Sequence, residues 1–267
     1  MSIWGYVGIF YLISLICCAV GFKKYVYFLS VGYGFSILGL GVAYFVISLA
    51  RVFDWNALAY FQCILFMCYG ARLSSFLIKR ELKNGNYRKV LKEATKEDEK
   101  PMPVFVKIAI WLCVGILYFA QTSPVFFRIY NGKGSDAVQL IGIIISAAGI
   151  ILEAISDQQK SAQKAKNPNM VATKGLFKMV RCPNYLGEII FWTGVLVSSL
   201  NALSGVGQWL TAVIGWILIV FIMFNGAQRL DRRQEKRYGE MKEYRDYADH
   251  TPIIIPLTPV YHIGKYK

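Results

Sequence analysis

The sequence predicts an all-α integral membrane protein with seven transmembrane helices, its N-terminus outside and its C-terminus in the cytoplasm. Apolar residues make up 55% of the 267 residues, and they are gathered in long blocks instead of being spread along the chain. About 20 helical residues cross a hydrocarbon layer of roughly 30 Å. Blocks long enough to do so lie at approximately 3–22, 25–50, 56–79, 103–125, 136–156, 184–202 and 207–227.

The first block, at 3–22, is expected to remain as a span and not to be removed as a signal peptide. No basic region precedes it, and Lys23 and Lys24 follow it where cleavage requires small residues.

Basic residues are unevenly divided between the two sets of loops. Four segments hold 25 of the 30 Lys and Arg residues: 22–25, 79–102, 156–183 and the tail from 228. The opposite loops hold only Arg51, Arg128 and Lys133. Because cytoplasmic loops are enriched in Lys and Arg, this division predicts the orientation given above. The same rule accounts for the net charge of +14, so no nucleic-acid partner is expected.

We expect a single membrane domain over 1–267. Its parts are the first three spans at 1–79, a basic cytoplasmic loop at 80–102, four spans at 103–227 with a cofactor-binding region from about 150, and a cytoplasmic tail at 228–267. Segment 80–100 is interpreted as an amphipathic helix or, with more weight, as a linker. The apolar run 253–255 is expected to pack back on the membrane face. The chain is short and has no organelle signal, which predicts a bacterial inner membrane; we expect a monomer.

Composition excludes several kinds of site. The only histidines, His250 and His262, lie in the tail, which excludes a His-rich metal site and a Ser-His-Asp hydrolase within the membrane. The six cysteines form no Cys-x-x-Cys, and five lie in apolar blocks, so they are interpreted as buried apolar residues. The sequence has no evident internal repeat, which argues against an inverted-repeat transporter fold. No Rossmann fingerprint or P-loop is present, so any nucleotide must be held between the spans and the basic loops.

Polar residues follow one face of the third predicted span, where ionisable groups cost several kcal/mol. Gln62, Phe66, Tyr69, Arg72 and Phe76 recur at helical spacing. Arg72 either snorkels to the interface or binds a partner helix. Beside Arg72 and Gln62, the hydroxyl of Tyr69 is a candidate hydrogen-bond donor into a cavity; the alternative is a packed interfacial aromatic residue.

The fifth predicted span ends in two carboxylates one turn apart, Glu153 and Asp157. They suit the hydroxyl groups of a ribose. They also suit pairing with Lys160 and Lys164, which continue the same face, or simple hydration.

The entry to the sixth predicted span, RCPNYLGEIIFW, favours a functional site. Asn184, Glu188 and Trp192 lie on one helix face, and Arg181 stands just before the helix. The N-terminus of such a helix offers free backbone N–H groups to an anion. We interpret this entry as the phosphate-proximal entrance for a cytoplasmic nucleotide.

Residues 150–258 resemble the C-terminal region of the steroid 5α-reductase family, above all its bacterial membrane members. The resemblance rests on the stretch GLFKMVRCPNYLGEIIFWTG, on Asp157, and on the pattern of Tyr244, Tyr247, Thr251, Ile255 and Pro256. It is thinner over the third span. The Gly-Leu-Phe and Pro-Asn-Tyr-x-Gly-Glu elements are shared with sterol reductases and, more loosely, with isoprenylcysteine carboxyl methyltransferases.

The resemblance implies a seven-helix reductase that binds NADPH from the cytoplasm and a steroid or other lipid from the bilayer. It implies cofactor contacts at Asp157, Lys164, Asn184, Tyr185, Glu188, Arg232 and Tyr247, and Arg181 at the phosphate-proximal entrance completes the expected cofactor site. Tyr69 matches the tyrosine that hydrogen-bonds the substrate ketone, and Gln62 is its expected catalytic neighbour. A hydride would pass to the β-carbon of a 3-oxo-Δ4-steroid-like enone while Tyr69 polarises the carbonyl.

Two positions depart from the family pattern. Steroid reductases hold the ketone with a Gln-Glu pair on an early helix, whereas Asp54 is the only acid before Glu81 and Gln62 the only early glutamine. Glu153 also stands where better-known members carry Asn. The first departure weighs against a 3-keto-steroid substrate, and the second indicates an altered cofactor site.

Two other functions compete with the reductase. One is a methyltransferase that uses S-adenosylmethionine on a membrane-anchored group. Such enzymes usually carry Arg-His-Pro where this chain has Arg181, Cys182 and Pro183, which favours the reductase. The other is a lipid-binding or scaffold protein without catalysis, in which Glu188 and Asn184 would be replaceable by Leu.

Overall fold

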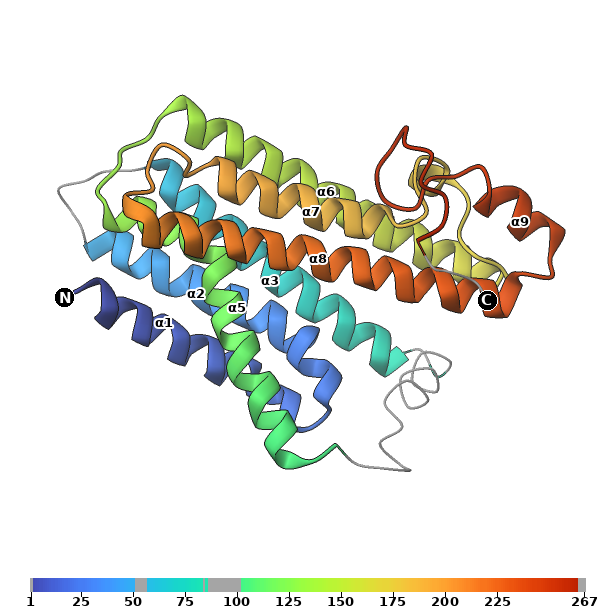
Figure 1. The fold of residues 1–267 in the computed structure, drawn as a ribbon, viewed down its shortest axis with the longest axis horizontal. Helices are drawn as coiled ribbons and strands as arrows, with labels where there is room; N and C mark the ends of the chain where they lie inside the picture. The colour runs from blue at the N-terminus through green and yellow to red at the C-terminus, as the bar shows by residue number, and fades with distance from the viewer. Residues whose placement is uncertain (1, 51–56, 84, 86–101, 264–267) are drawn as a thin grey trace. The chain divides into compact units, whose positions relative to one another are not determined.

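The computed structural model describes residues 2–50, 57–83, 85 and 102–263, and all regular structure in them is helical (Figure 1). The predicted loop at 80–102, apart from its first residues, lies outside them, as do Asp54 and Arg51. The elements are α1 (Ile3–Cys18), η1 (Ala19–Phe22), η2 (Tyr25–Leu29), α2 (Val31–Ala50), α3 (Ala57–Lys83), α5 (Val104–Tyr130), α6 (Ala137–Lys166), η3 (Gly175–Lys178), α7 (Pro183–Val197), α8 (Gly205–Tyr238) and α9 (Lys242–Ala248).

Six helices among the described residues are long and apolar enough to cross a membrane, so the protein is a multi-pass integral membrane protein. They are α1 continued by η1, α2, α3, α5, α6 and α8. The remaining predicted span, 184–202, forms the 15-residue helix α7, because residues 198–202 turn instead of continuing the helix. At 1.5 Å per residue α7 is about 22 Å long, which is less than the roughly 30 Å of a hydrocarbon core.

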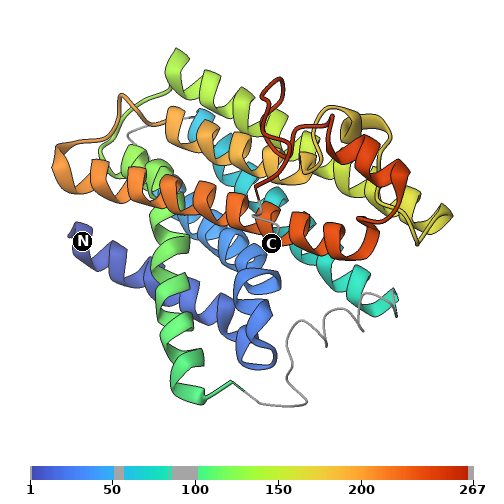
Figure 2. The ribbon, with the colours of Figure 1, turned by 45° about the vertical axis from the view of Figure 1, so that its right-hand side comes forward.

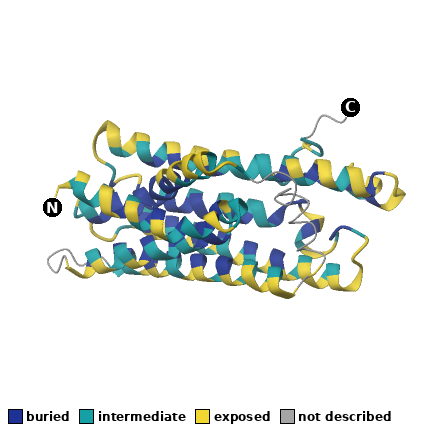
Figure 3. Cartoon of the chain, turned by 90° about the horizontal axis from the view of Figure 1, so that it is seen from below, coloured by how far each residue is buried: buried dark blue, intermediate teal, exposed yellow. Residues whose placement is uncertain are grey.

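The outward faces of the six candidate spans are apolar. Large apolar side chains are more than half exposed on these helices, for example Val46, Phe61, Ile116, Ile144 and Phe221. Figure 3 shows such exposed positions along the helices and at their ends, with buried positions on the sides where helices face one another. In water this much exposed apolar surface would be unfavourable, whereas acyl chains solvate it.

The first compact unit, Met1–Ile143 and Leu196–Gly215, is built around aromatic side chains. The ring of Phe10 lies edge-on to those of Tyr44 and Phe126, with centroids 4.8 Å apart in each pair. Small residues bring α2 and α3 into backbone contact: a Cβ on Gly70 would lie 2.3 Å from the carbonyl oxygen of Gly34. Such close approach is typical of helix pairs in membranes, where packing replaces the hydrophobic effect as the driving force.

A buried arginine connects two turns of this unit by hydrogen bonds and an ion pair. Arg128, fully buried at the end of α5, forms an ion pair with Asp136 and donates to the carbonyl oxygens of Ser198 (2.9 Å) and Gly134 (2.6 Å) and to Asn201 (3.0 Å). It therefore joins the turn after α5 to the turn after α7. The sequence placed Arg128 in an external loop; instead α5 continues through it.

The second compact unit, Ile144–Val195 and Trp216–Lys267, packs α7 between parts of α6 and α8 (Figures 1 and 2). On α6, a Cβ at Gly149 would meet the backbone N of Phe191 at 2.4 Å. On α8, Trp216 donates to the Thr193 hydroxyl at 3.0 Å, and a Cβ at Gly226 would contact the Tyr185 ring. The earlier residue of α8, Trp216, contacts the later residue of α7, and the later residue of α8, Gly226, contacts the earlier one. The two helices are therefore antiparallel.

Both α6 and α8 continue well past their predicted ends at 156 and 227. With 30 and 34 residues they are about 45 and 51 Å long, which exceeds a hydrocarbon core of roughly 30 Å. The segments that follow the apolar part carry most of the basic residues of this unit. Lys, Arg, Gln and Ala favour helix as strongly as Leu does, so the end of the apolar block is not the end of the helix.

The apolar run of the tail packs on the start of α7. The backbone N–H groups of Arg181 and Cys182 donate to the carbonyl oxygens of Pro252 and Ile253, each at 2.8 Å. Ile253 and Ile254 are buried together with Cys182 and Ala227, whereas Ile255 is half exposed. These contacts fix residues 252–254 against the entry to α7.

Candidate functional site: a basic pocket

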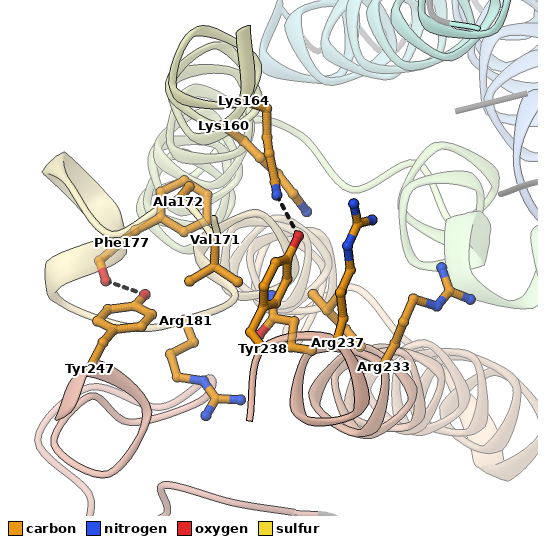
Figure 4. A pocket seen from close by; sticks show the side chains of 12 residues that line it. Lys160, Lys164, Val171, Ala172, Phe177, Arg181, Arg233, Arg237, Tyr238 and Tyr247 are labelled. Atoms are coloured by element: carbon orange, nitrogen blue, oxygen red, sulfur yellow. Dashed lines mark hydrogen bonds between the residues drawn. The ribbon is translucent and has the colours of Figure 1, made fainter. Parts of the chain in front are cut away.

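The C-terminal parts of α6 and α8, together with η3 and α9, enclose a pocket of about 150 Å³ in the second unit (Figure 4). Five of its lining residues are basic: Lys160, Lys164, Arg181, Arg233 and Arg237. We call it the basic pocket. The remaining lining residues are Val171, Ala172, Phe177, Leu230, Gln234, Tyr238 and Tyr247, so in the described part of the chain no acidic residue lines the pocket.

Helical spacing produces the concentration of charge. Lys160 and Lys164 lie one turn apart on α6, and Arg233 and Arg237 lie one turn apart on α8. Residues four apart share a helix face, so each helix presents two cations to the same pocket (Figure 4). Like charges at this spacing repel one another, and a bound anion relieves that repulsion.

Tyr238 organises two of these cations. Its hydroxyl lies 2.9 Å from Nζ of Lys164, which also donates to the carbonyl oxygen of Pro168 at 3.3 Å. The Lys164 ammonium lies 5.1 Å from the Tyr238 ring centroid and the Arg237 guanidinium 5.4 Å from it. Both distances are in the range of cation–π attraction, so the ring holds two like charges at the edge of the pocket.

Arg181 is the most buried of the five cations. It is 3% exposed and forms an ion pair with Asp231, which is fully buried on α8. Burial alone would lower the pKa of Arg181, but the Asp231 carboxylate raises it above its ordinary value. The Nε and Nη1 atoms of Arg181 are buried without a hydrogen-bond partner among the described residues. Unmet buried donors of this kind are costly.

Two glutamines of α6 hold the loop that forms one wall. Gln163 Oε1 accepts from the backbone N–H groups of Thr173 and Lys174, each at 2.9 Å, and Gln159 Oε1 accepts from that of Leu176 at 2.8 Å. Gly175 between them has a φ of +69°, and a Cβ there would lie 2.3 Å from Gln159 Oε1. Only glycine fits this position without strain, so the path of the wall is fixed locally.

The C-terminal helix contributes an aromatic side to the pocket. The Tyr247 hydroxyl donates to the carbonyl oxygen of Phe177 at 2.7 Å (Figure 4). Burial raises the pKa of Tyr247 above its ordinary value and that of Tyr244 to about 12. Both phenols are therefore neutral at physiological pH and add no negative charge beside the cations.

The chemistry of the pocket favours a multiply charged anion with an apolar or aromatic part. Several cations without a lining acid suit phosphate groups, for which Arg is the best-matched side chain. No group of three His, Cys, Asp or Glu residues suitable for a metal ion occurs within the described ranges.

The structure brings three of the predicted cofactor residues together: Lys164, Arg181 and Tyr247 all line the basic pocket. A fourth, Arg232, is exposed and does not line it, whereas the next residue, Arg233, does. On a helix, adjacent residues point about 100° apart, so a one-residue difference decides which arginine reaches the pocket.

The other predicted cofactor residues lie in α6 and α7 but do not line this pocket. Asp157 and Glu188 are buried, and Tyr185 is half-buried near Gly226. Glu188 accepts a hydrogen bond from the Trp192 indole at 3.2 Å, the i, i+4 pair expected on one helix face. Oδ1 of Asn184 is buried without a hydrogen-bond partner among the described residues.

The two predicted catalytic residues belong to the first unit. Tyr69 is fully buried; its hydroxyl donates to that of Tyr33 at 3.2 Å, and the Arg72 guanidinium lies 5.9 Å from its ring. Gln62, also fully buried, donates to the Ser198 hydroxyl, while its Oε1 has no partner within the described segments. Both residues of the polar face predicted for the third span, Gln62 and Tyr69, therefore point into the protein interior.

Sequence reasoning missed Arg233, Arg237 and Tyr238 as members of the site. Their signal was present: after Asp231, arginines recur four residues apart, as lysines do at the end of α6. Hydropathy does not connect these arginines to the last span, because they lie beyond its apolar block.

A protein-family model described as "Protein of unknown function (DUF1295)" matches residues 31–251, from α2 through α9. The chain belongs to the DUF1295 family. It is also distantly related to steroid 5-alpha-reductases. The steroid 5-alpha-reductase DET2 of Gossypium hirsutum is 24% identical over 121 residues, which is 44% of this chain and 42% of that protein.

Two further relatives extend this comparison. The 3-oxo-5-alpha-steroid 4-dehydrogenase 1 of Bos taurus is 25% identical over 165 residues, 59% of this chain and 58% of that protein. The uncharacterized protein C7D4.09c of Schizosaccharomyces pombe is 38% identical over 109 residues, 39% of this chain and 37% of that protein. The chain thus spans roughly half the length of the curated relatives it matches. No solved structure matches it significantly.

Proposed function

We propose that this protein is an NADPH-dependent membrane reductase that saturates a carbon–carbon double bond in a lipid, with a 3-oxo-Δ4-steroid-like enone as the substrate class. The observation that carries the proposal is the basic pocket, which combines five cations with apolar and aromatic walls. The distant relation to steroid 5-alpha-reductases supports the same reaction.

The basic pocket fits the phosphate-bearing end of the dinucleotide. NADPH carries three phosphate groups, and the five lining cations match phosphate oxygens. A cavity of about 150 Å³ is smaller than the several hundred Å³ of a site for a whole drug-sized ligand. We therefore assign to it the adenosine phosphate end. Asp157, Asn184 and Glu188 then serve the ribose and nicotinamide end.

The charge of the pocket also separates the two enzymatic hypotheses. S-adenosylmethionine carries a sulfonium and an ammonium cation against one carboxylate, so five lining cations without a lining acid would repel it. A dinucleotide with several phosphate charges is attracted by the same residues. The pocket therefore favours the reductase over the methyltransferase.

In the proposed reaction the chain's own residues bind, orient and polarise. When bound, NADPH would supply a hydride for the β-carbon of the enone and water would supply the proton for the α-carbon, so that NADP⁺ and the saturated ketone are the products. The Tyr69 hydroxyl donates a hydrogen bond to the substrate carbonyl oxygen, where negative charge develops. In the structure that proton is donated to the Tyr33 hydroxyl, and when Tyr69 donates to the substrate the Tyr33 hydroxyl can turn and donate to Tyr69 instead. Gln62, with a buried Oε1 lacking a partner in the described part of the chain, offers an acceptor to a hydroxyl group or other donor of the lipid substrate.

We further propose that α7 makes the seventh crossing. It runs antiparallel to α8, so the chain must return across the membrane between α6 and α8 despite the short length of the helix. With the N-terminus outside, the basic ends of α6 and α8 then face the cytoplasm. NADPH is available there, and a lipid substrate enters from the bilayer.

A binding titration tests this proposal. Detergent-purified protein is titrated with NADPH, NADH and S-adenosylmethionine, with the Glu188→Ala variant in parallel and the melting temperature of both proteins as a folding control. We expect micromolar NADPH binding that weakens in the variant. Binding of S-adenosylmethionine alone would promote the methyltransferase, and binding of none of the three would favour a scaffold.

A further inference from the structure

A second cavity, of about 290 Å³, lies in the first unit where α1, α2 and α3 end or begin. Its walls are apolar: Val20, Val31, Phe35, Ile78 and Leu82. Its rim is polar and consists of Lys23, Lys24, Tyr27 and Glu81. We call it the amphipathic pocket.

The rim is held in place by one ion-pair network. Glu81 Oε1 accepts from Lys24 Nζ at 2.6 Å, and the Tyr27 hydroxyl lies 2.6 Å from each carboxylate oxygen. The hydrogen bond with Glu81 is the main reason that the pKa of Lys24 is raised, so Lys24 keeps its charge at physiological pH. Glu81 neutralises one of the two lysines, and exposed Lys23 leaves the rim with one positive charge in excess.

The amphipathic pocket lies at the level where the apolar spans stop. The candidate span Ile3–Phe22 ends directly before Lys23, and the next begins at Val31. Leu82, at the end of α3, is 68% exposed although it lines the pocket, and Ile78, one turn earlier, is also exposed. The apolar wall is therefore accessible from outside the protein on the side of the spans, while the lysines stand just beyond them.

We propose that the amphipathic pocket binds one acidic phospholipid. Its phosphate lies against Lys23 and Lys24, and the first methylene groups of an acyl chain lie against Phe35, Ile78 and Leu82. A positive rim above an apolar wall is the arrangement with which transmembrane proteins hold anionic head groups on the cytoplasmic side. The site is separate from the proposed dinucleotide pocket and does not depend on the reductase reaction.

The test compares phosphatidylglycerol with phosphatidylcholine of the same acyl chains, each added to the delipidated protein in a neutral detergent while the melting temperature is followed. We expect phosphatidylglycerol to raise the melting temperature more than phosphatidylcholine does. Lys23→Ala, which leaves the Lys24–Glu81 pair intact, and Leu82→Glu, at an exposed position, should each remove at least about half of that difference.

Lys79→Ala is the matched control, because it deletes the same charge at an exposed position of α3 that does not line the pocket. The control should keep the full difference. Equal shifts with both lipids, or equal losses in Lys23→Ala and Lys79→Ala, would overturn the proposal. Inorganic phosphate is added in a parallel series. If phosphate alone reproduces the phosphatidylglycerol shift, the ligand is a free anion and the lipid assignment is wrong.

Discussion

Arg181 and Asp231 form a buried ion pair that joins the entry of α7 to the extended part of α8. Asp231 Oδ2 also accepts from the backbone N–H of Ile263 at 3.2 Å. The Asp231 carboxylate thus binds both Arg181 of the basic pocket and the backbone of the tail at Ile263.

Removing Asp231 is therefore expected to destabilise the protein strongly. Asp231→Ala leaves the Arg181 charge buried and uncompensated, at a cost of about 3–5 kcal/mol in the free energy of unfolding. The double variant Arg181→Met/Asp231→Leu should lose less, because no buried charge is left. Denaturant unfolding in detergent measures both. A double variant less stable than the single one would contradict this account of the pair.

Arg233→Gln is expected to weaken NADPH binding about five- to tenfold, because it removes one charge-assisted contact in the basic pocket. Arg232→Gln, one residue earlier and exposed outside the pocket, is the matched control and should bind normally. Isothermal titration of both variants decides between them. The opposite ranking would show that the family-based assignment of Arg232 is right and that the pocket does not hold the cofactor.

Tyr69→Phe is expected to lower kcat roughly 100- to 1,000-fold, because the hydrogen bond to the developing oxyanion is lost. The Kd for NADPH should stay unchanged, since Tyr69 is assigned to the substrate and not to the cofactor. Steady-state rates with an enone lipid and a parallel NADPH titration separate the two effects. An unchanged kcat would remove Tyr69 from the mechanism.

Gly149→Ala is expected to destabilise the second unit by about 1–3 kcal/mol, the usual range for overpacking. The new Cβ would lie 2.4 Å from the Phe191 backbone N, which a backbone cannot avoid without separating α6 from α7. Gly207→Ala, on α8 with nothing within 4 Å of the added atom, is the control. Melting temperatures of the two variants in one detergent should differ clearly.

Asp136 should give the protein a defined acid sensitivity. Desolvation raises its pKa, but hydrogen bonds from the Gln139 backbone and from Arg128 outweigh this and lower it to about 2, below the ordinary 3.8. Because the folded-state value is the lower one, the stabilisation is complete above the ordinary value and is lost as pH falls toward 2.

The measurement is the unfolding midpoint at about pH 6 and about pH 2.5. Asp136→Asn should be less stable than the native protein at the higher pH and should lose less on acidification. Parallel slopes for the two proteins would show that another group dominates this pH range.

The helical membrane architecture was predictable because bilayer spans require long apolar blocks, and the sequence has them. The bounds of the fifth and seventh blocks mark the apolar stretches, and the helices extend beyond both of them. Hydropathy marks where a helix leaves lipid, whereas α6 and α8 continue to Lys166 and Tyr238 on strong helix formers. The early end of α7 at Val197 coincides with the polar residues Ser198, Ser199 and Asn201, which the predicted span 184–202 included.

Within the candidate site, the predicted residues Lys164, Arg181 and Tyr247 line one pocket. All three lie in the segments that follow or precede the apolar blocks on the side expected to be cytoplasmic. The pairing of Arg181 with Asp231 could not be predicted. It depends on the register between α8 and the entry of α7, which no local pattern specifies.

The hydrogen bonds from Arg181 and Cys182 to residues 252 and 253 also have a consequence for synthesis of the protein. While α7 enters the membrane, those acceptors have not yet been translated. The spans can insert one after another, but the basic pocket lacks Tyr247 and the contacts behind Arg181 until the tail has followed. The basic pocket is therefore complete only after the last residues of the tail have been made.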